Sequence, residues 1–139
     1  MKRSTYIDRL ARVPMFRALP KKDLTLIARH SDSVSVPAGR ELTTEGTTGY
    51  EFFFIASGTA TVKRKKRKVA TLKAGDYFGE LALLADVPRN ATVVADTDME
   101  LYVVDRRQFS ALVRDVPEIA VKLLKGLALR LSEADTARI

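Results

Sequence analysis

The sequence contains no cysteine and a single histidine, His30. Without cysteine the chain can form neither disulfide bonds nor thiolate metal sites, and this absence fits a protein of the reducing cytosol. One histidine is too few for a multi-histidine metal centre, and it makes a Ser-His-Asp triad hard to build. We therefore expect no bound metal, and we expect His30 to be a surface residue at a helix end.

Long apolar runs are also missing. No stretch approaches the roughly 18 apolar residues that span a bilayer, and the N-terminus has no apolar block of the signal-peptide type. Apolar residues still make up 46% of the 139 positions, which is enough to build a hydrophobic core. This length fits one domain, 1–139. We therefore predict a single cytoplasmic domain without a membrane span.

An excess of positive over negative charge is nearly absent outside one short segment. The net charge is +7, but the run KRKKRK at 63–68 supplies six of the 24 basic residues, against 17 acidic ones. The basicity is therefore local, unlike that of a typical nucleic-acid-binding domain. The run can be interpreted as a patch for nucleic acid or a membrane surface, or as a solvated hairpin. The hairpin is the simpler interpretation, and we do not expect nucleic acid as a partner.

The N-terminal part, 1–30, has the pattern of helices. Apolar residues at helical spacing precede Pro14, which is expected to end the first helix. A second helix is predicted after Pro20, with Leu24 and Ile27 on its apolar face. This part is therefore predicted to be helical.

From 31 to 105 the pattern changes to β-branched and aromatic residues that alternate with polar ones. Glycine and proline interrupt this pattern every eight to twelve residues, which is typical of a jelly-roll or sandwich. The candidate strands are Val34–Val36, Arg40–Thr44, Glu51–Ala56, Thr59–Lys63, Lys68–Leu72, Ala91–Ala95 and Glu100–Val104. We therefore predict an α+β chain that is mainly a β-roll.

The C-terminal part, 106–135, returns to helix. Asp105 with Gln108, and Asp115 with Glu118, both have the spacing of a capping box at a helix start. The last helix is long and amphipathic, with an apolar stripe formed by Ile119, Ala120, Leu123, Leu124, Leu127, Ala128 and Leu131.

The stretch FGELALLADVPRNATV, 78–93, combines charged residues with an otherwise apolar segment. ELALLA favours a short helix within the roll, and the first turn of a helix has amide groups that attract anions. Gly79 lets the backbone approach a ligand closely, and Arg89 offers a planar cation to a phosphate. Glu80 would repel a phosphate but can accept a hydrogen bond from a sugar hydroxyl. Together these groups describe a pocket for a ribose phosphate.

At these residues the sequence resembles the cyclic-nucleotide-binding domain family. FGELALL, the spacer ADV and then PRNATV match its motif without a gap, and VPMFRALPKKDLTLIA and VPAGRELTTEGTTGYEFFFIASGTATV resemble its N-terminal helices and early strands. The resemblance implies an eight-stranded jelly-roll with N-terminal helices, a short phosphate-binding helix and two C-terminal helices. It also implies a cyclic nucleotide as ligand, cAMP or cGMP, and no enzymatic activity.

The resemblance also implies roles for individual residues. Glu80 would bind the ribose 2′-hydroxyl, Arg89 the cyclic phosphate, and the backbone amides of Leu81 and Ala82 would complete the phosphate cradle. Gly79 would permit the close approach. The remaining implied contacts are Asn90 and Ala91 after the arginine, and Val62, Leu72 and Phe78 as apolar walls near the base and sugar.

Asn90 departs from the pattern, because the family usually has Thr, Ser or Ala there. A threonine at this position can favour cGMP by bonding the guanine amino group. Asparagine is both donor and acceptor, so it can serve either base or crowd the pocket. The choice between cAMP and cGMP stays open, with cAMP as the default of compact domains of this kind.

Family members often close the pocket with a residue of the last helix. At about 100° per residue, Arg130 falls roughly 20° from Ile119 around the axis, close to the stripe that holds Leu127. A guanidinium there can stack on a purine as a lid, or its side chain can extend to water from the edge of the stripe. Leu127 and Arg130 are the candidate lid residues.

Three hypotheses of function follow. The first is a standalone regulatory domain in which the nucleotide moves the last helix, which then signals to an unknown protein partner or a second copy, as monomer or homodimer. The second is a DNA-associated transcription regulator without its own helix-turn-helix, since the sequence stops at Ile139, or a fragment of a larger channel or kinase regulator. The third, a metal-barrel enzyme, lacks a ligand set because the chain has one histidine.

Overall fold

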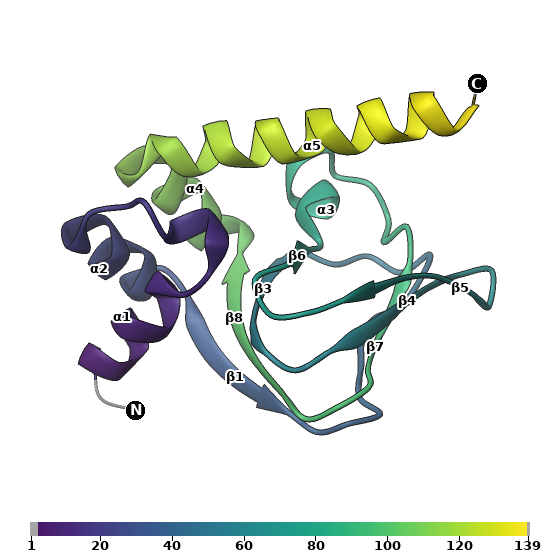
Figure 1. Ribbon diagram of the computed structural model, residues 1–139, viewed down its shortest axis with the longest axis horizontal. Helices are drawn as coiled ribbons and strands as arrows, with labels where there is room; N and C mark the ends of the chain where they lie inside the picture. Colours follow the sequence, from purple (N-terminus) through teal and green to yellow (C-terminus); the bar gives the residue numbers. More distant parts are fainter. Residues whose placement is uncertain (1–2, 139) are drawn as a thin grey trace.

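The computed structural model describes residues 3–138, apart from the side chains at 3–5, 82, 84, 130, 131 and 133–138. The helical segments are α1 (Arg3–Ala11), the 3-10 helix η1 (Pro14–Phe16), α2 (Lys21–Arg29), α3 (Glu80–Leu84), α4 (Arg106–Asp115) and α5 (Pro117–Arg138). The strands are β1 (Asp32–Val36), β2 (Glu41–Thr43), β3 (Glu51–Ser57), β4 (Ala60–Arg64), β5 (Arg67–Leu72), β6 (Tyr77–Phe78), β7 (Thr92–Ala95) and β8 (Met99–Asp105). Figure 1 shows the helices at one end and along one side of a β-roll.

The roll consists of two four-stranded antiparallel sheets, in the orders β1-β8-β3-β6 and β2-β7-β4-β5. The predicted eight-stranded roll with flanking helices is thereby confirmed, and every candidate strand overlaps an observed one. Strand β6 was not predicted, because two residues are too few to show an alternating pattern. Tyr77 and Phe78 pair with Phe54 and Phe53 of β3, so β6 places the start of α3 against the edge of the first sheet.

The central strand β3 is buried on both faces, which explains its unbroken apolar run. Phe52 and Phe54 point toward the helices, where the Phe54 ring lies 4.9 Å from that of Phe16. Phe53 and Ile55 point into the roll. One strand therefore joins two hydrophobic cores, one beneath the helices and one between the sheets.

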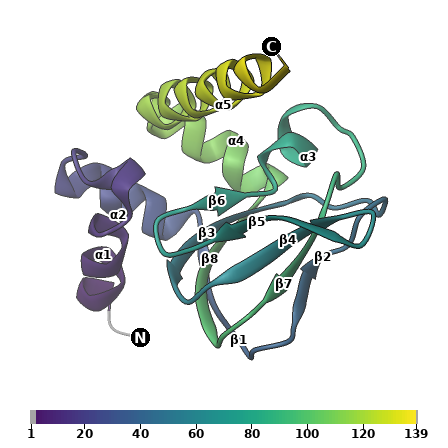
Figure 2. The same ribbon diagram turned by 45° about the vertical axis from the view of Figure 1, so that its right-hand side comes forward.

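Helix α5 runs along one side of the roll (Figure 1), and both views place it above α3 (Figures 1 and 2). It is anchored by its first half, where Ile119 and Leu123 are almost fully buried, at 0% and 2% exposure. Farther along, the stripe residues Leu124 and Ala128 are exposed, so only part of the predicted apolar stripe packs on the core. Within the described residues, each helix is too short or too polar to cross a membrane.

One of the two predicted capping boxes is confirmed. The Asp105 side chain accepts from the Gln108 amide at 2.8 Å, and the Gln108 side chain accepts from the Asp105 amide at 2.9 Å. The second prediction is wrong, because α4 continues to Asp115 and α5 begins only at Pro117. The Asp115 carboxylate instead lies 3.0 Å from Nε2 of His30, which is at the end of α2 as predicted. A tertiary contact thus uses the carboxylate that local spacing assigned to a cap.

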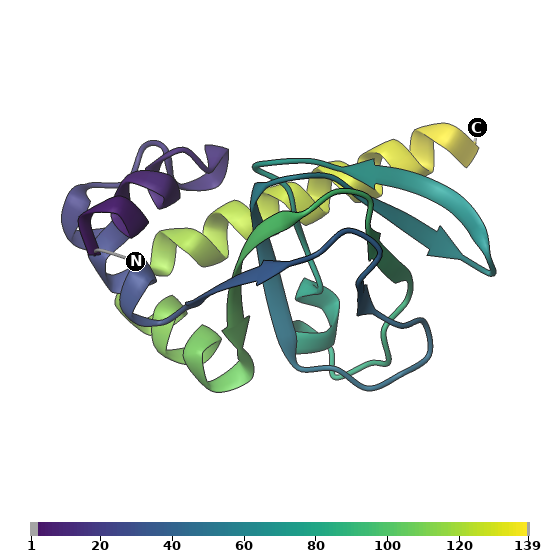
Figure 3. The ribbon, with the colours of Figure 1, turned by 90° about the horizontal axis from the view of Figure 1, so that it is seen from below.

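The basic run forms a hairpin, as predicted, although most of its charges lie in strands and not in a loop. Strands β4 and β5 extend to Arg64 and Arg67 and leave a two-residue turn, Lys65–Lys66, with φ of 52° and 68°. Figure 3 shows this hairpin projecting from the roll. Both the turn and the neighbouring basic residues are exposed to solvent.

Candidate functional site

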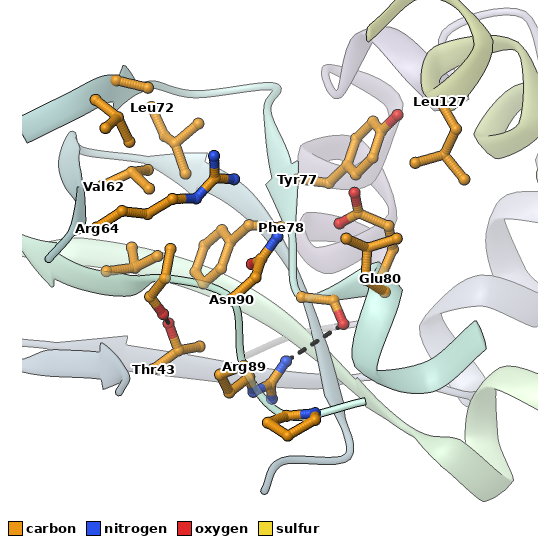
Figure 4. Close-up of a pocket in the computed structure, with 17 residues that line it drawn as sticks. Thr43, Val62, Arg64, Leu72, Tyr77, Phe78, Glu80, Arg89, Asn90 and Leu127 are labelled. Carbon is orange, nitrogen blue, oxygen red and sulfur yellow. Dashed lines mark hydrogen bonds between the residues drawn. The ribbon is translucent and has the colours of Figure 1, made fainter. Parts of the chain in front are cut away.

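A cavity of about 560 Å³ lies between the inner face of the second sheet, the β6–α3 segment and helix α5. Figure 4 shows its lining side chains. The residues that line it are Thr43, Val62, Arg64, Val69, Ala70, Leu72, Tyr77, Phe78, Gly79, Glu80, Leu81, Pro88, Arg89, Asn90, Ala91, Val93 and Leu127. Three of them are charged, namely Arg64, Glu80 and Arg89, so the cavity combines apolar walls with a few charged groups.

Most of the predicted site residues meet in this cavity. Those that line it are Val62, Leu72, Phe78, Gly79, Glu80, Leu81, Arg89, Asn90, Ala91 and the lid candidate Leu127. The side chains of Ala82 and of the other lid candidate, Arg130, lie outside the described residues. The fold therefore brings together predicted residues from five separate stretches of the chain. Their roles in binding stay predictions.

Gly79 precedes α3 in a left-handed conformation, with φ of 88°. A β-carbon there would lie 2.7 Å from the Glu51 carbonyl oxygen and 2.8 Å from Nη1 of Arg89. Both the backbone angle and the lack of space thus require glycine. This residue allows β3, the start of α3 and the arginine to pack directly against one another.

The Arg89 side chain is 7% exposed and is held by backbone carbonyls. Its Nη2 donates to the Glu51 carbonyl at 2.9 Å, and its Nη1 donates to the Gly79 carbonyl at 3.3 Å. A guanidinium has five N–H donors, so one that is anchored by two carbonyls still has donors to offer an anion. The two bonds fix the position of the cation before any ligand arrives.

The loop between β2 and β3 encloses this arginine, which the sequence analysis did not foresee. The Arg89 amide donates to the Thr47 carbonyl at 2.8 Å, and the Gly46 amide donates to the Arg89 carbonyl at 2.8 Å. A β-carbon at Gly49 would collide with the guanidinium of Arg89. The segment EGTTG was interpreted only as a turn, and nothing in its local pattern indicates that its second glycine makes room for a side chain 40 residues away.

Glu80 is the first residue of α3, and its side chain is only 3% exposed. In Figure 4 its carboxylate lies beside the Tyr77 ring. Burial lowers the pKa of Arg89, and the carboxylates of Glu51 and Glu80 partly offset this effect. The site thus buries a carboxylate and a guanidinium in one cavity, close enough that the carboxylate affects the pKa of the guanidinium.

Helix α5 contacts the site at Gly126 and Leu127. Leu127 lines the cavity, and the preceding Gly126 lies against the Tyr77 hydroxyl so closely that a β-carbon would collide with it. The Tyr77 ring in turn stacks on Phe52, with ring centroids 5.7 Å apart. A glycine in a helix interior weakens the helix, so its close approach to Tyr77 is a structural reason for its presence.

Several lining residues were absent from the sequence prediction, namely Thr43, Arg64, Val69, Ala70, Tyr77, Pro88 and Val93. Arg64 could have been found, because strand alternation from Ala60 through Val62 places it on the same face. It was instead treated as part of the basic hairpin. The described residues include no cluster of three or more His, Asp or Glu side chains that could hold a metal ion.

Comparison with known families gives one match that covers most of the chain. The sequence model described as "Cyclic nucleotide-binding domain" matches residues 33–115. This range includes the roll from β1 to β8 except for its first residue, the short helix α3 and the three charged residues described in the cavity.

Comparison with individual proteins gives similar regulators. The chain is 38% identical over 119 residues to the cAMP-dependent protein kinase regulatory subunit of Eremothecium gossypii, covering 85% of this chain and 26% of that protein. The catabolite activator protein of Thermus thermophilus superposes with a TM-score of 0.84 at 32% identity, covering 89% and 61%. The structure of PKAR CBD2 bound to Sp-2Cl-cAMPS gives 0.79 at 30% identity, covering 96% and 92%. The chain thus spans about a quarter of the curated kinase subunit that it matches.

Proposed function

Because the chain belongs to the cyclic nucleotide-binding domain family, we propose that it is a regulatory domain that binds cAMP in the cavity beneath α5. The family binds a ligand and is not defined by a reaction, in line with the expectation of no catalysis. The observation that supports this proposal most is that one cavity buries both Glu80 and Arg89, at 3% and 7% exposure. Together they offer a hydrogen-bond acceptor and a cation to a ligand that carries hydroxyl and phosphate groups.

The proposed contacts follow from the chemistry of each lining group. The Arg89 guanidinium pairs with the cyclic phosphate, together with the backbone amides of Leu81 and Ala82. The Glu80 carboxylate accepts a hydrogen bond from the ribose 2′-hydroxyl. The apolar side chains of Val62 and Leu72 contact the purine. We select cAMP as the first ligand because the similar kinase subunit is named as cAMP-dependent.

Calorimetric titration with cAMP tests these contacts. We expect Arg89→Ala to weaken binding about 100-fold, because charged hydrogen bonds to the phosphate are lost. Glu80→Gln keeps the shape of the side chain and should weaken binding about tenfold. Arg114→Ala, which removes an exposed arginine that does not line the cavity, should leave binding unchanged. A wild-type chain that binds no cyclic nucleotide, or Arg89 and Glu80 variants that bind like wild type, would refute the proposal.

We further propose that nucleotide binding moves the second half of α5. The first half is held by the buried side chains of Ile119 and Leu123, whereas the second half reaches the cavity through Leu127. A ligand in the cavity therefore meets the helix beyond its anchor, and the shift is the signal to a protein partner in the cytoplasm. Amide hydrogen exchange with and without cAMP should change at 124–138 and stay constant at 117–123. Equal exchange along the whole helix would exclude this signal.

A further inference from the structure

Among the described residues, Arg64 is the one charged lining residue of the cavity to which neither the motif nor the proposed contacts assign a role. It is the last residue of β4, and the alternation of that strand places it on the same face as Ala60 and Val62. Ala60 is fully buried and Val62 lines the cavity. The same strand face that forms the apolar wall therefore ends in a guanidinium.

This guanidinium lies at the opposite end of the cavity from the anion-binding groups. Figure 4 shows Arg64 beside Val62 and Leu72 and extending over the wall formed by Phe78, whereas Glu80 and Arg89 lie on the far side of Phe78. A nucleotide with its phosphate at Arg89 therefore has its base in the part of the cavity that Arg64 borders.

No acidic side chain among the described residues forms an ion pair with Arg64. Its cross-strand neighbour is Arg67, and like charges that face each other across a hairpin are destabilising. The sequence thus keeps a cation at the rim of the cavity without a partner from the same hairpin. A ligand with acceptor atoms can supply that partner.

The two purines differ in the acceptors that they offer to such a fork. Guanine presents O6 and N7 side by side, and an arginine can bond both at once. Adenine presents N7 beside an amino group, which is a donor, so a guanidinium can form only one bond there. We propose that Arg64 contacts the six-position edge of the purine and shifts base selectivity toward guanine. This inference depends on the proposed function, because it assumes that the cavity binds a cyclic nucleotide.

Titration of three nucleotides into the wild-type chain and its variants tests the inference. The nucleotides are cAMP, cGMP and cyclic inosine monophosphate, which has the O6 and N7 of cGMP but not its amino group. We expect Arg64→Ala to reduce the affinity for cGMP and for cyclic inosine monophosphate about tenfold, and the affinity for cAMP less than about twofold. Arg64→Lys keeps the charge without the planar fork, so it should lose most of the same selectivity. Lys66→Ala is the control, because it removes one charge from the tip of the same hairpin, outside the cavity lining. It should leave the affinities for all three nucleotides unchanged.

Three results separate this inference from the function on which it depends. If the wild-type chain binds none of the nucleotides, both the proposed function and the role of Arg64 are overturned. If it binds them but Arg64→Ala weakens all three equally or none, only the role of Arg64 is overturned. If Arg64→Lys keeps the wild-type ratio of cGMP to cAMP affinity, the arginine contributes charge alone, and the two-acceptor contact is wrong.

Discussion

The guanidinium of Arg89 occupies the space that a β-carbon at Gly49 would need. These two residues are 40 positions apart in the sequence, yet the Arg89 side chain leaves room only for glycine at position 49. Gly49 has no positive φ, so its backbone would tolerate alanine. The restriction at Gly49 is therefore steric, and it arises from the ligand-binding arginine of the proposed site.

We therefore expect Gly49→Ala to displace the Arg89 side chain. The displaced guanidinium would lose its bonds to the carbonyls of Glu51 and Gly79, and the added methyl group should destabilise the fold by about 1–3 kcal/mol. Calorimetry should show cAMP affinity reduced about tenfold or more, as for loss of a charged hydrogen bond. Gly39→Ala is the matched control, because it strains a glycine with φ of 88° where an added β-carbon meets nothing within 4 Å, and this turn makes no contact with Arg89. Equal affinities for the two variants would contradict this prediction.

The contact between Tyr77 and Gly126 predicts a coupled pair. By helix propensity alone, Gly126→Ala should stabilise α5 by about 1 kcal/mol. The added methyl group would, however, collide with the Tyr77 hydroxyl. We expect the single variant to increase hydrogen exchange in the second half of α5. Adding Tyr77→Phe removes the hydroxyl and should restore protection, with an interaction energy of about 1 kcal/mol in unfolding experiments. Additive effects of the two substitutions would show that the contact does not position the helix.

The hairpin turn predicts a stabilising substitution. Lys65 and Lys66 both have positive φ, which costs roughly 1 kcal/mol or more for a residue with a β-carbon, whereas Asn-Gly favours such a turn. The double substitution Lys65→Asn with Lys66→Gly should raise the free energy of unfolding in urea by about 1–2 kcal/mol. Replacing both lysines by alanine removes the same charges without relieving the backbone. If the alanine pair gives an equal gain, charge repulsion and not backbone conformation destabilises the turn.

Tyr102 predicts a loss of stability in alkali. Burial raises the pKa of Tyr102 to about 12, so the unfolded chain releases this proton near pH 10 while the folded chain retains it. The neutral phenol therefore contributes fully to the free energy of unfolding below about pH 10, and this contribution is lost as the pH rises toward 12. Tyr102→Phe should therefore reduce the decline in the free energy of unfolding between pH 10 and 12. A decline as steep as that of wild type would contradict the prediction.

The same variant should be harmless at neutral pH. The buried Tyr102 hydroxyl has no hydrogen-bond partner among the described residues, so its removal should change stability by less than about 1 kcal/mol. Tyr6→Phe is the matched control, because the Tyr6 hydroxyl pairs with that of Ser31 at 2.6 Å. Loss of this bond should destabilise the chain by about 1 kcal/mol at pH 7. Burial also raises the pKa of Tyr6, so part of the alkaline decline should persist in Tyr102→Phe.

Local sequence determined most helices and strands of this protein, its family, and the two charged residues Glu80 and Arg89. Alternation with glycine and proline breaks located every strand except β6, and the spacing of Asp105 and Gln108 located the start of α4, because these signals act within a few residues. The contiguous motif from Phe78 to Val93 also carried the resemblance that the family match confirms. Glu80 and Arg89 could be predicted because both lie within that one segment.

Only the tertiary structure decided which distant residues meet. In the folded chain Asp115 pairs with His30 and does not cap α5. Gly49 lies beside Arg89, and Gly126 lies beside Tyr77. Arg64 lies at the rim of the cavity. Such contacts depend on how sheets and helices pack across the whole chain. The spacing of neighbouring residues does not predict that packing. A close contact between distant segments requires only one glycine or one charged residue in each segment, and a single residue forms no pattern in the sequence.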